Sequence, residues 1–87
     1  MDDLDQGRGV TPRLPSLSTL QVVAALRKAG FEDAPRRGKG SHRAVIQKGD
    51  PPRLVIVPER KNLPIGTLRG IIRQAGLTPE EFLRLVG

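Results

Sequence analysis

Two short apolar segments separated by a turn constrain the fold of this chain more than any other feature of its sequence. Residues 53–57 read RLVIV and are followed by Pro58, and residues 41–48 carry AVI at their centre. Branched apolar residues favour strands, and the sequence GDPP at residues 49–52 is typical of a turn. The sequence therefore predicts an antiparallel β-hairpin, although the alternation of side chains does not decide its register.

A helix is predicted before this hairpin, over residues 19–29. Ser18 and Gln21 fit a capping box, in which the two side chains bind free backbone N–H groups at the start of a helix. Gly30 supplies the C-terminal stop. The helical spacing of three apolar residues predicts the face that packs on the core: Leu20, Val23 and Leu26.

Two further helices are predicted after the hairpin. The first begins near Pro64 and ends at Gly76, and Thr78 opens the second through another capping box. We expect Phe82, in the last helix, to be a core residue. The predicted apolar stripe of the first of these two helices consists of Ile65, Leu68, Ile72 and Ala75.

The order of these elements predicts an α+β fold with a small antiparallel sheet. Residues 31–37 could add a first strand, and Pro35 favours an edge position for it. Strands that follow one another without a helix between them pair antiparallel, and the flanking helices cover one face of the sheet. We predict one domain over residues 17–87, preceded by a disordered tail over residues 1–16, which is poor in apolar residues.

The charge of the chain indicates the kind of partner that it binds. Its 87 residues carry a net charge of +6, and eight Lys or Arg residues lie between positions 36 and 61 against two acidic residues. This density of cations favours a polyanion such as nucleic acid. The chain has no Cys, no apolar run long enough to cross a bilayer and no amphipathic helix suited to a membrane surface, so we expect a soluble cytoplasmic protein.

Composition excludes several classes of nucleic-acid-binding protein and enzyme. An RNA-recognition motif stacks bases on aromatic residues of its strands, whereas the only aromatic residues here are Phe31 and Phe82. One His without Cys cannot form a zinc site, the Gly spacing matches no phosphate-binding loop, and the acidic residues are too scattered for a two-metal nuclease. We therefore expect neither a metal nor an organic cofactor.

The single histidine, His42, lies in the cationic segment RRGKGSHR at residues 36–43. The simplest interpretation is a solvated loop that enters a strand, with glycines that permit a positive φ. A second interpretation is that backbone amides and cations of this turn enclose a phosphate, and that their positive charge favours neutral imidazole, the form that acts as a base. The cations concerned are Arg36, Arg37, Lys39 and Arg43.

Cleavage of an RNA strand needs this combination of groups. A base takes the proton of a ribose 2′-OH, the oxygen attacks the adjacent phosphorus, and cations stabilise the charge that accumulates. We predict His42 as the base, while Lys39, water or His42 itself could act as the acid for the departing oxygen. The predicted supporting residues are Lys39, Gly40, Ser41 and Arg43 at the scissile phosphate, and Arg36, Arg37, Arg53 and Lys61 along the RNA backbone.

Four segments occur in a specific order and at specific separations: LRKAGF at residues 26–31, GKGSH at 38–42, VIVP at 55–58 and GTLRGIIRQAGLTPEEFL at 66–83. Together they resemble the HicA (YcfA-like) toxins of bacterial toxin–antitoxin systems. The resemblance covers residues 20–85. It implies a small fold like that of a double-stranded-RNA-binding domain (dsRBD), helix–three strands–helix, and the activity of a ribosome-independent mRNA interferase.

The resemblance also implies a site and a partner. The family's catalytic His, in its Gly-Ser-His motif, corresponds to His42, and the two residues before it correspond to Gly40 and Ser41. The implied partner is a HicB-type antitoxin, which is encoded beside the toxin and covers its active surface. Many members carry another His shortly after the Pro that ends the last strand, whereas Pro58 is followed here by ERK at residues 59–61.

Two interpretations without catalysis stay open from the sequence. The chain could be an RNA-binding module whose basic hairpin grips duplex RNA by shape, with His42 only supporting the loop. It could also be a protein-interaction domain that docks an acidic partner. Cleavage products distinguish the first of these from a ribonuclease, and competition between RNA and the partner distinguishes the second.

Overall fold

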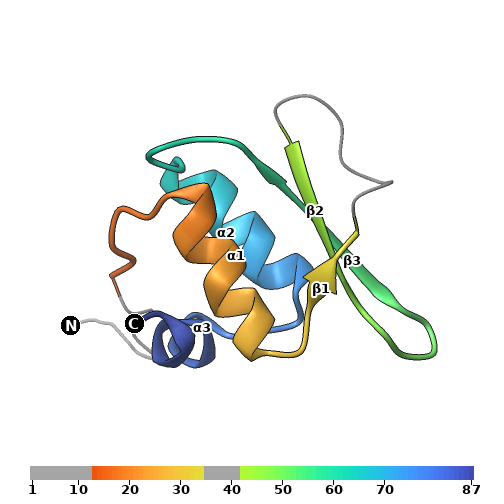
Figure 1. Cartoon of the computed structure of the whole chain (residues 1–87). Helices are drawn as coiled ribbons and strands as arrows, with labels where there is room; N and C mark the ends of the chain where they lie inside the picture. The colour runs from red at the N-terminus through yellow and green to blue at the C-terminus, as the bar shows by residue number, and fades with distance from the viewer. Residues whose placement is uncertain (1–12, 35–41) are drawn as a thin grey trace.

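The computed structural model describes residues 13–34 and 42–87, which form three helices and a three-stranded sheet (Figure 1). All three strands pair antiparallel in the order β1-β2-β3, and the helices gather on one side of the sheet (Figure 1). This arrangement confirms the predicted α+β class and its likeness to a dsRBD. The elements are α1 (Thr19–Lys28), β1 (Glu32–Asp33), β2 (His42–Gln47), β3 (Arg53–Pro58), α2 (Ile65–Gln74) and α3 (Pro79–Leu85).

Helix α1 begins at the predicted capping box. The Ser18 side chain accepts from the backbone of Gln21, and the Gln21 side chain accepts from the backbone N–H of Ser18. The predicted core face was wrong at Leu20, which is 66% exposed. The buried face is centred instead on Thr19, Val22, Val23, Ala25 and Leu26, because the helix presents the side of Thr19 to the rest of the protein.

The hairpin has a register that separates a buried face from an open one. Val45 pairs with Val55, and both are fully buried under the helices. Side chains alternate along a strand, so the residues on either side of Val45 in β2 and of Val55 in β3 point to the opposite face, which no described helix covers. This open face consists of His42, Ala44 and Ile46 on β2 and of Leu54, Ile56 and Pro58 on β3.

The first strand is an edge strand, as predicted, but its described part is short. Glu32 and Asp33 pair with Ile46 and Val45 of β2. Positions 35–37, which the sequence assigned to the same strand, lie outside the described residues. Phe31, just before β1, is buried in the core.

Helices α2 and α3 complete the core. Phe82 is fully buried, as predicted, and Thr78 forms the expected capping box with Glu81. The predicted stripe of α2 was wrong at Ile65, which is 41% exposed because it is the first residue of the helix and follows the exposed Pro64. Ile71 is buried in its place, beside Leu68, Ile72 and Ala75.

Packing begins before residue 17. Leu14 is buried in the core, and the Ser16 hydroxyl donates to Oδ1 of Asn62 at 2.7 Å. Leu14 and Ser16 both belong to the segment that the sequence analysis assigned to the tail, while residues 1–12 of that segment lie outside the described residues. Within the described ranges, no helix is long and apolar enough to span a bilayer.

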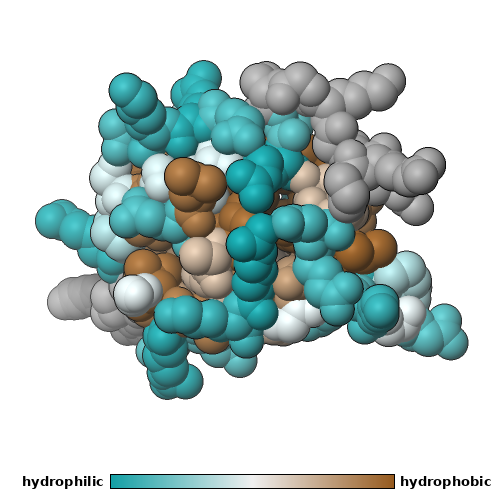
Figure 2. Space-filling model, viewed as in Figure 1, coloured by the Kyte–Doolittle hydropathy of each residue, from teal (hydrophilic) through white to brown (hydrophobic). Residues whose placement is uncertain are grey.

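The surface over the helices is mostly hydrophilic. Figure 2 shows charged and polar side chains over much of the visible face, with separate hydrophobic patches between them, one of which covers the N-terminal part of α1. The large hydrophobic residues that are exposed within the described part of the chain are Leu20, Leu54, Ile56 and Ile65.

Candidate active site

His42 is the first residue of β2 and is exposed. It pairs across the hairpin with Pro58, the last residue of β3. The alternation of side chains places it on the open face of the sheet, at one end of the apolar row that Ala44, Ile56 and Leu54 form. An imidazole in this position can be reached by a ligand as large as an RNA strand, which a base acting on RNA requires.

Five of the predicted site residues lie outside the described residues, so their roles stay predictions. These residues are Arg36, Arg37, Lys39, Gly40 and Ser41.

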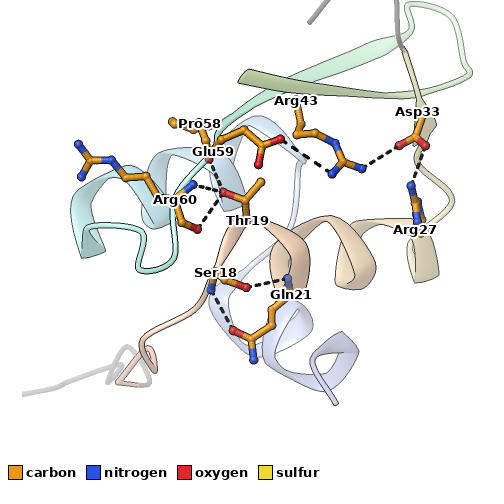
Figure 3. Close-up of polar contacts among 9 residues, drawn as sticks. All are labelled: Ser18, Thr19, Gln21, Arg27, Asp33, Arg43, Pro58, Glu59 and Arg60. Carbon is orange, nitrogen blue, oxygen red and sulfur yellow. Dashed lines mark hydrogen bonds and ion pairs between the residues drawn. The ribbon is translucent and has the colours of Figure 1, made fainter. Parts of the chain in front are cut away.

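The structure does not bring Arg43 alongside His42. Adjacent residues of a strand point to opposite faces, and Arg43 shares the face of the buried Val57. Its guanidinium lies 3.9 Å from Oδ1 of Asp33 and 4.0 Å from Oε2 of Glu59 (Figure 3). These two carboxylates hold Arg43 on the helix side of the sheet.

Asp33 also forms a shorter ion pair, with Arg27. Nη2 of Arg27 donates to Oδ2 of Asp33 at 2.7 Å, which joins α1 to β1. This hydrogen bond, with the positive charges of Arg27 and Arg43, holds the pKa of Asp33 below its usual value. The same hydrogen bond and the negative charge of Asp33 raise the pKa of Arg27. Arg43 therefore belongs to a row of charged side chains that runs from Arg27 on α1 through Asp33 on β1 to Glu59, on the helix side of the sheet.

The other two predicted backbone contacts lie at opposite ends of β3. Arg53 begins the strand, and its Nη1 donates to the backbone oxygen of Gln74 at 3.4 Å. Pro58 lies five positions after Arg53 along the strand, a distance of about 17 Å. Lys61 follows shortly after Pro58 and is exposed, so it lies at the same end of the hairpin as His42. The structure therefore groups Lys61, but not Arg53, with the histidine.

Thr19 is a site residue that the sequence analysis did not identify. It is buried, and its hydroxyl donates to the carbonyl oxygen of Pro58 and accepts from the backbone N–H of Arg60 at 2.7 Å (Figure 3). Its own N–H donates to the carbonyl oxygen of Arg60 at 2.9 Å. A Thr at the start of a helix looks like ordinary capping chemistry in the sequence, and only the contact with a segment about forty residues away shows its role.

These bonds fix the connection that follows β3. Leu63 donates its N–H to the carbonyl oxygen of Leu17 at 2.8 Å, so residues 17–19 and 58–63 run against each other. Pro58, the partner of His42, is thereby attached to the start of α1. The backbone opposite His42 is therefore held by partly buried hydrogen bonds, which restrict the position of this end of the hairpin.

Metal ligands do not gather in the described part of the chain. Within residues 13–34 and 42–87, no three His, Cys, Asp or Glu side chains lie close enough together to hold an ion. The groups at the His42 end of the hairpin are one imidazole, the cations Arg60 and Lys61, and Glu59 beside Arg43. Such a set can exchange a proton and stabilise a phosphate.

Comparison with known families agrees with this geometry. A family model described as "HicA toxin of bacterial toxin-antitoxin" matches residues 21–77, which is more than half of the chain. The match includes His42, all three strands and α2. It confirms the resemblance found in the sequence. No curated protein matches the chain.

Proposed function

Because the chain belongs to the HicA family of toxins from bacterial toxin–antitoxin systems, we propose that it is an mRNA interferase, an endoribonuclease that uses His42 as its base. The observation that carries the proposal is the position of His42. It is exposed, lies on the open face of the sheet, and starts a strand whose partner is followed by Arg60 and Lys61.

The reaction uses the ribose of the substrate as the nucleophile. The imidazole of His42 takes the proton of a 2′-OH, and the oxygen forms a bond to the adjacent phosphorus while the bond to the 5′-oxygen breaks. The new bond closes a 2′,3′-cyclic phosphate on one fragment. The imidazolium can return its proton to the departing oxygen, so the other fragment ends in a free 5′-OH. Cations near the phosphate stabilise the negative charge of the transition state. DNA, which lacks the 2′-OH, is not a substrate.

The residues near His42 in the sequence are proposed to have separate tasks. Lys39, Gly40 and Ser41 precede His42 in the sequence and are proposed to bind the scissile phosphate, with Arg36 and Arg37 along the RNA backbone. Arg43 acts indirectly, through its ion pair with Glu59.

A HicB-type antitoxin is the proposed protein partner. Leu54 and Ile56 are exposed on the same face as His42, and apolar residues in a row are suited to burial by a protein. An antitoxin on this face would cover the imidazole and prevent access of mRNA in the cytoplasm.

The test compares the purified wild-type chain with His42→Ala on a labelled single-stranded RNA. Wild type should give fragments with a 2′,3′-cyclic phosphate and a 5′-OH, and His42→Ala should give none while keeping the circular-dichroism spectrum of the wild type. A matched RNA in which every 2′-OH is replaced by hydrogen should stay intact. Binding of RNA by wild type without any cleavage would instead support an RNA-binding module.

A further inference from the structure

A hollow of about 320 Å³ lies at the His42 end of the molecule, between the start of α1 and the connection that follows β3. The cleavage reaction proposed for His42 does not involve this hollow. Its lining consists of Ser18, Thr19, Leu20, Glu59, Arg60 and Lys61.

We propose that this hollow is a subsite for one unpaired nucleotide of the RNA substrate, with the base on Leu20 and the phosphate at Arg60 and Lys61. The inference rests on the proposed ribonuclease function and extends it. It implies single-stranded RNA as the substrate, because a base can enter a hollow only when it is unpaired and unstacked.

Among the residues that line the hollow, Leu20 offers an apolar surface on which the flat face of a base can lie. Leu20 is 66% exposed, the largest exposure of any large hydrophobic residue in the described ranges. The polar groups beside it are already occupied, since the Thr19 hydroxyl binds Pro58 and Arg60 and the Ser18 side chain accepts from Gln21. The hollow therefore offers an apolar surface with few groups that could read the edge of a base, and we expect it to tolerate different bases.

The rim of the hollow is cationic. Arg60 and Lys61 are exposed, and Figure 3 shows the side chain of Arg60 directed away from the contact of its backbone with Thr19. A guanidinium can stack on a base or bind a phosphate, and a lysine can bind a phosphate. The one acidic residue of the lining, Glu59, lies 4.0 Å from the guanidinium of Arg43, which reduces its repulsion of a phosphate.

The hollow is close to the proposed base in space, although the residues that line it are distant from His42 in the sequence. Residues opposite each other in an antiparallel pair have Cα atoms about 5 Å apart, and consecutive Cα atoms are 3.8 Å apart. Because His42 pairs with Pro58 and Glu59 follows it, the Cα atom of Glu59 lies within roughly 10 Å of that of His42. An RNA strand can therefore pass over the end of the hairpin, with one ribose at His42 and a neighbouring base in the hollow.

The experiment measures two quantities for full-length variants: KM and kcat for cleavage of a single-stranded RNA, and Kd for the same oligonucleotide made with 2′-deoxy sugars, which cannot be cleaved. The test variants are Leu20→Ala and Arg60→Gln. Their matched controls are Ile65→Ala, another exposed hydrophobic residue of a helix, and Arg84→Gln, another exposed arginine.

We expect Leu20→Ala and Arg60→Gln each to raise KM and Kd about five- to tenfold, with kcat little changed, because the first removes apolar surface that the base would cover and the second removes a phosphate contact. The controls should differ little from wild type. Arg60→Gln should also lower the slope of log Kd against log salt by about 0.7, the value for one phosphate contact on a single strand, whereas Leu20→Ala should leave this slope unchanged.

Equal KM and Kd for test and control variants would overturn the subsite. So would a loss of antitoxin binding in Leu20→Ala without any loss of RNA binding, which would show a protein as the occupant. A wild-type chain that binds the uncleavable oligonucleotide but cleaves no RNA would refute the ribonuclease alone, since the Kd comparison would still decide whether the hollow holds a nucleotide.

Discussion

The hydroxyl of Thr19 donates a hydrogen bond to the carbonyl oxygen of Pro58, the residue that pairs with His42 across the hairpin. One buried side chain at the start of α1 therefore holds the backbone that lies opposite the proposed base. The hydroxyl oxygen of Thr19 also accepts a hydrogen bond from the backbone N–H of Arg60, a residue that lines the hollow. The hydrogen bonds of Thr19 therefore join the start of α1 both to the strand opposite His42 and to the hollow.

Thr19→Val should destabilise the protein by about 1–3 kcal/mol, because it leaves the carbonyl oxygen of Pro58 and the N–H of Arg60 without their partner in a partly buried place. Urea unfolding followed by circular dichroism measures the loss. Thr19→Ser keeps the hydroxyl and is the control, which should lose less. A Val variant as stable as wild type would show that these hydrogen bonds contribute nothing net.

Gly70→Ala should stabilise the protein by up to about 1 kcal/mol. Gly70 lies inside α2, and a Cβ atom there would have no neighbour within 4 Å, so the gain in helix propensity has no steric cost. Gly76→Ala is the opposite case, because Gly76 has a φ of +75° and a Cβ atom would lie 2.6 Å from the guanidinium of Arg53. Thermal unfolding should move up for the first variant and down for the second, and the same direction for both would contradict the argument.

Asp33→Asn should reduce stability at neutral pH and have no effect in acid. The pKa of Asp33 is lowered, chiefly by its hydrogen bond from Arg27, so its carboxylate stabilises the fold above the unfolded value of about 3.9. This contribution is lost as the pH falls through the folded pKa. The urea midpoints of wild type and variant should therefore differ at neutral pH and converge once the pH lies below both the folded and the unfolded pKa of Asp33.

Asp50→Asn is the control for that titration. Asp50 is exposed in the turn between β2 and β3 and forms no ion pair with any described residue. A difference between wild type and Asp33→Asn that stays constant down to acid pH would show that the ion pair is not its cause.

Phe82→Ala should cost about 3–5 kcal/mol, because Phe82 is fully buried between α3 and the rest of the core. A loss of this size is a large part of the total stability of a small domain. Calorimetry measures it, with Leu20→Ala as a control that should change the unfolding temperature little. Loss of RNA binding in Phe82→Ala without loss of stability would instead assign this ring to RNA.

Much of the fold could be predicted from local chemistry. Ser18 with Gln21 and Thr78 with Glu81 form capping boxes from residues three positions apart, so the starts of α1 and α3 depend only on neighbouring residues. The hairpin follows from a turn between two apolar segments, and Phe82 is too large and apolar to be left on the surface of so small a chain. His42 could be chosen as the candidate base for the same reason, because a single histidine among cations is a local feature of the sequence.

The arrangement of the site was decided by contacts between distant segments. A shift of one residue in the register would exchange His42 and Arg43 between the two faces, and both arrangements fit the same alternating sequence. Leu20 and Ile65 have helical spacing suited to a core, but the direction in which each helix packs leaves them exposed.

The type and order of the helices and strands could be predicted from the sequence alone, because they depend on interactions between neighbours in the chain, and the same local view made His42 the candidate base. Only the tertiary structure placed Thr19 under Pro58, put Arg43 between Asp33 and Glu59 and separated Arg53 from His42. Each of these depends on how two segments far apart in the chain meet. That meeting is decided by the packing of the whole core.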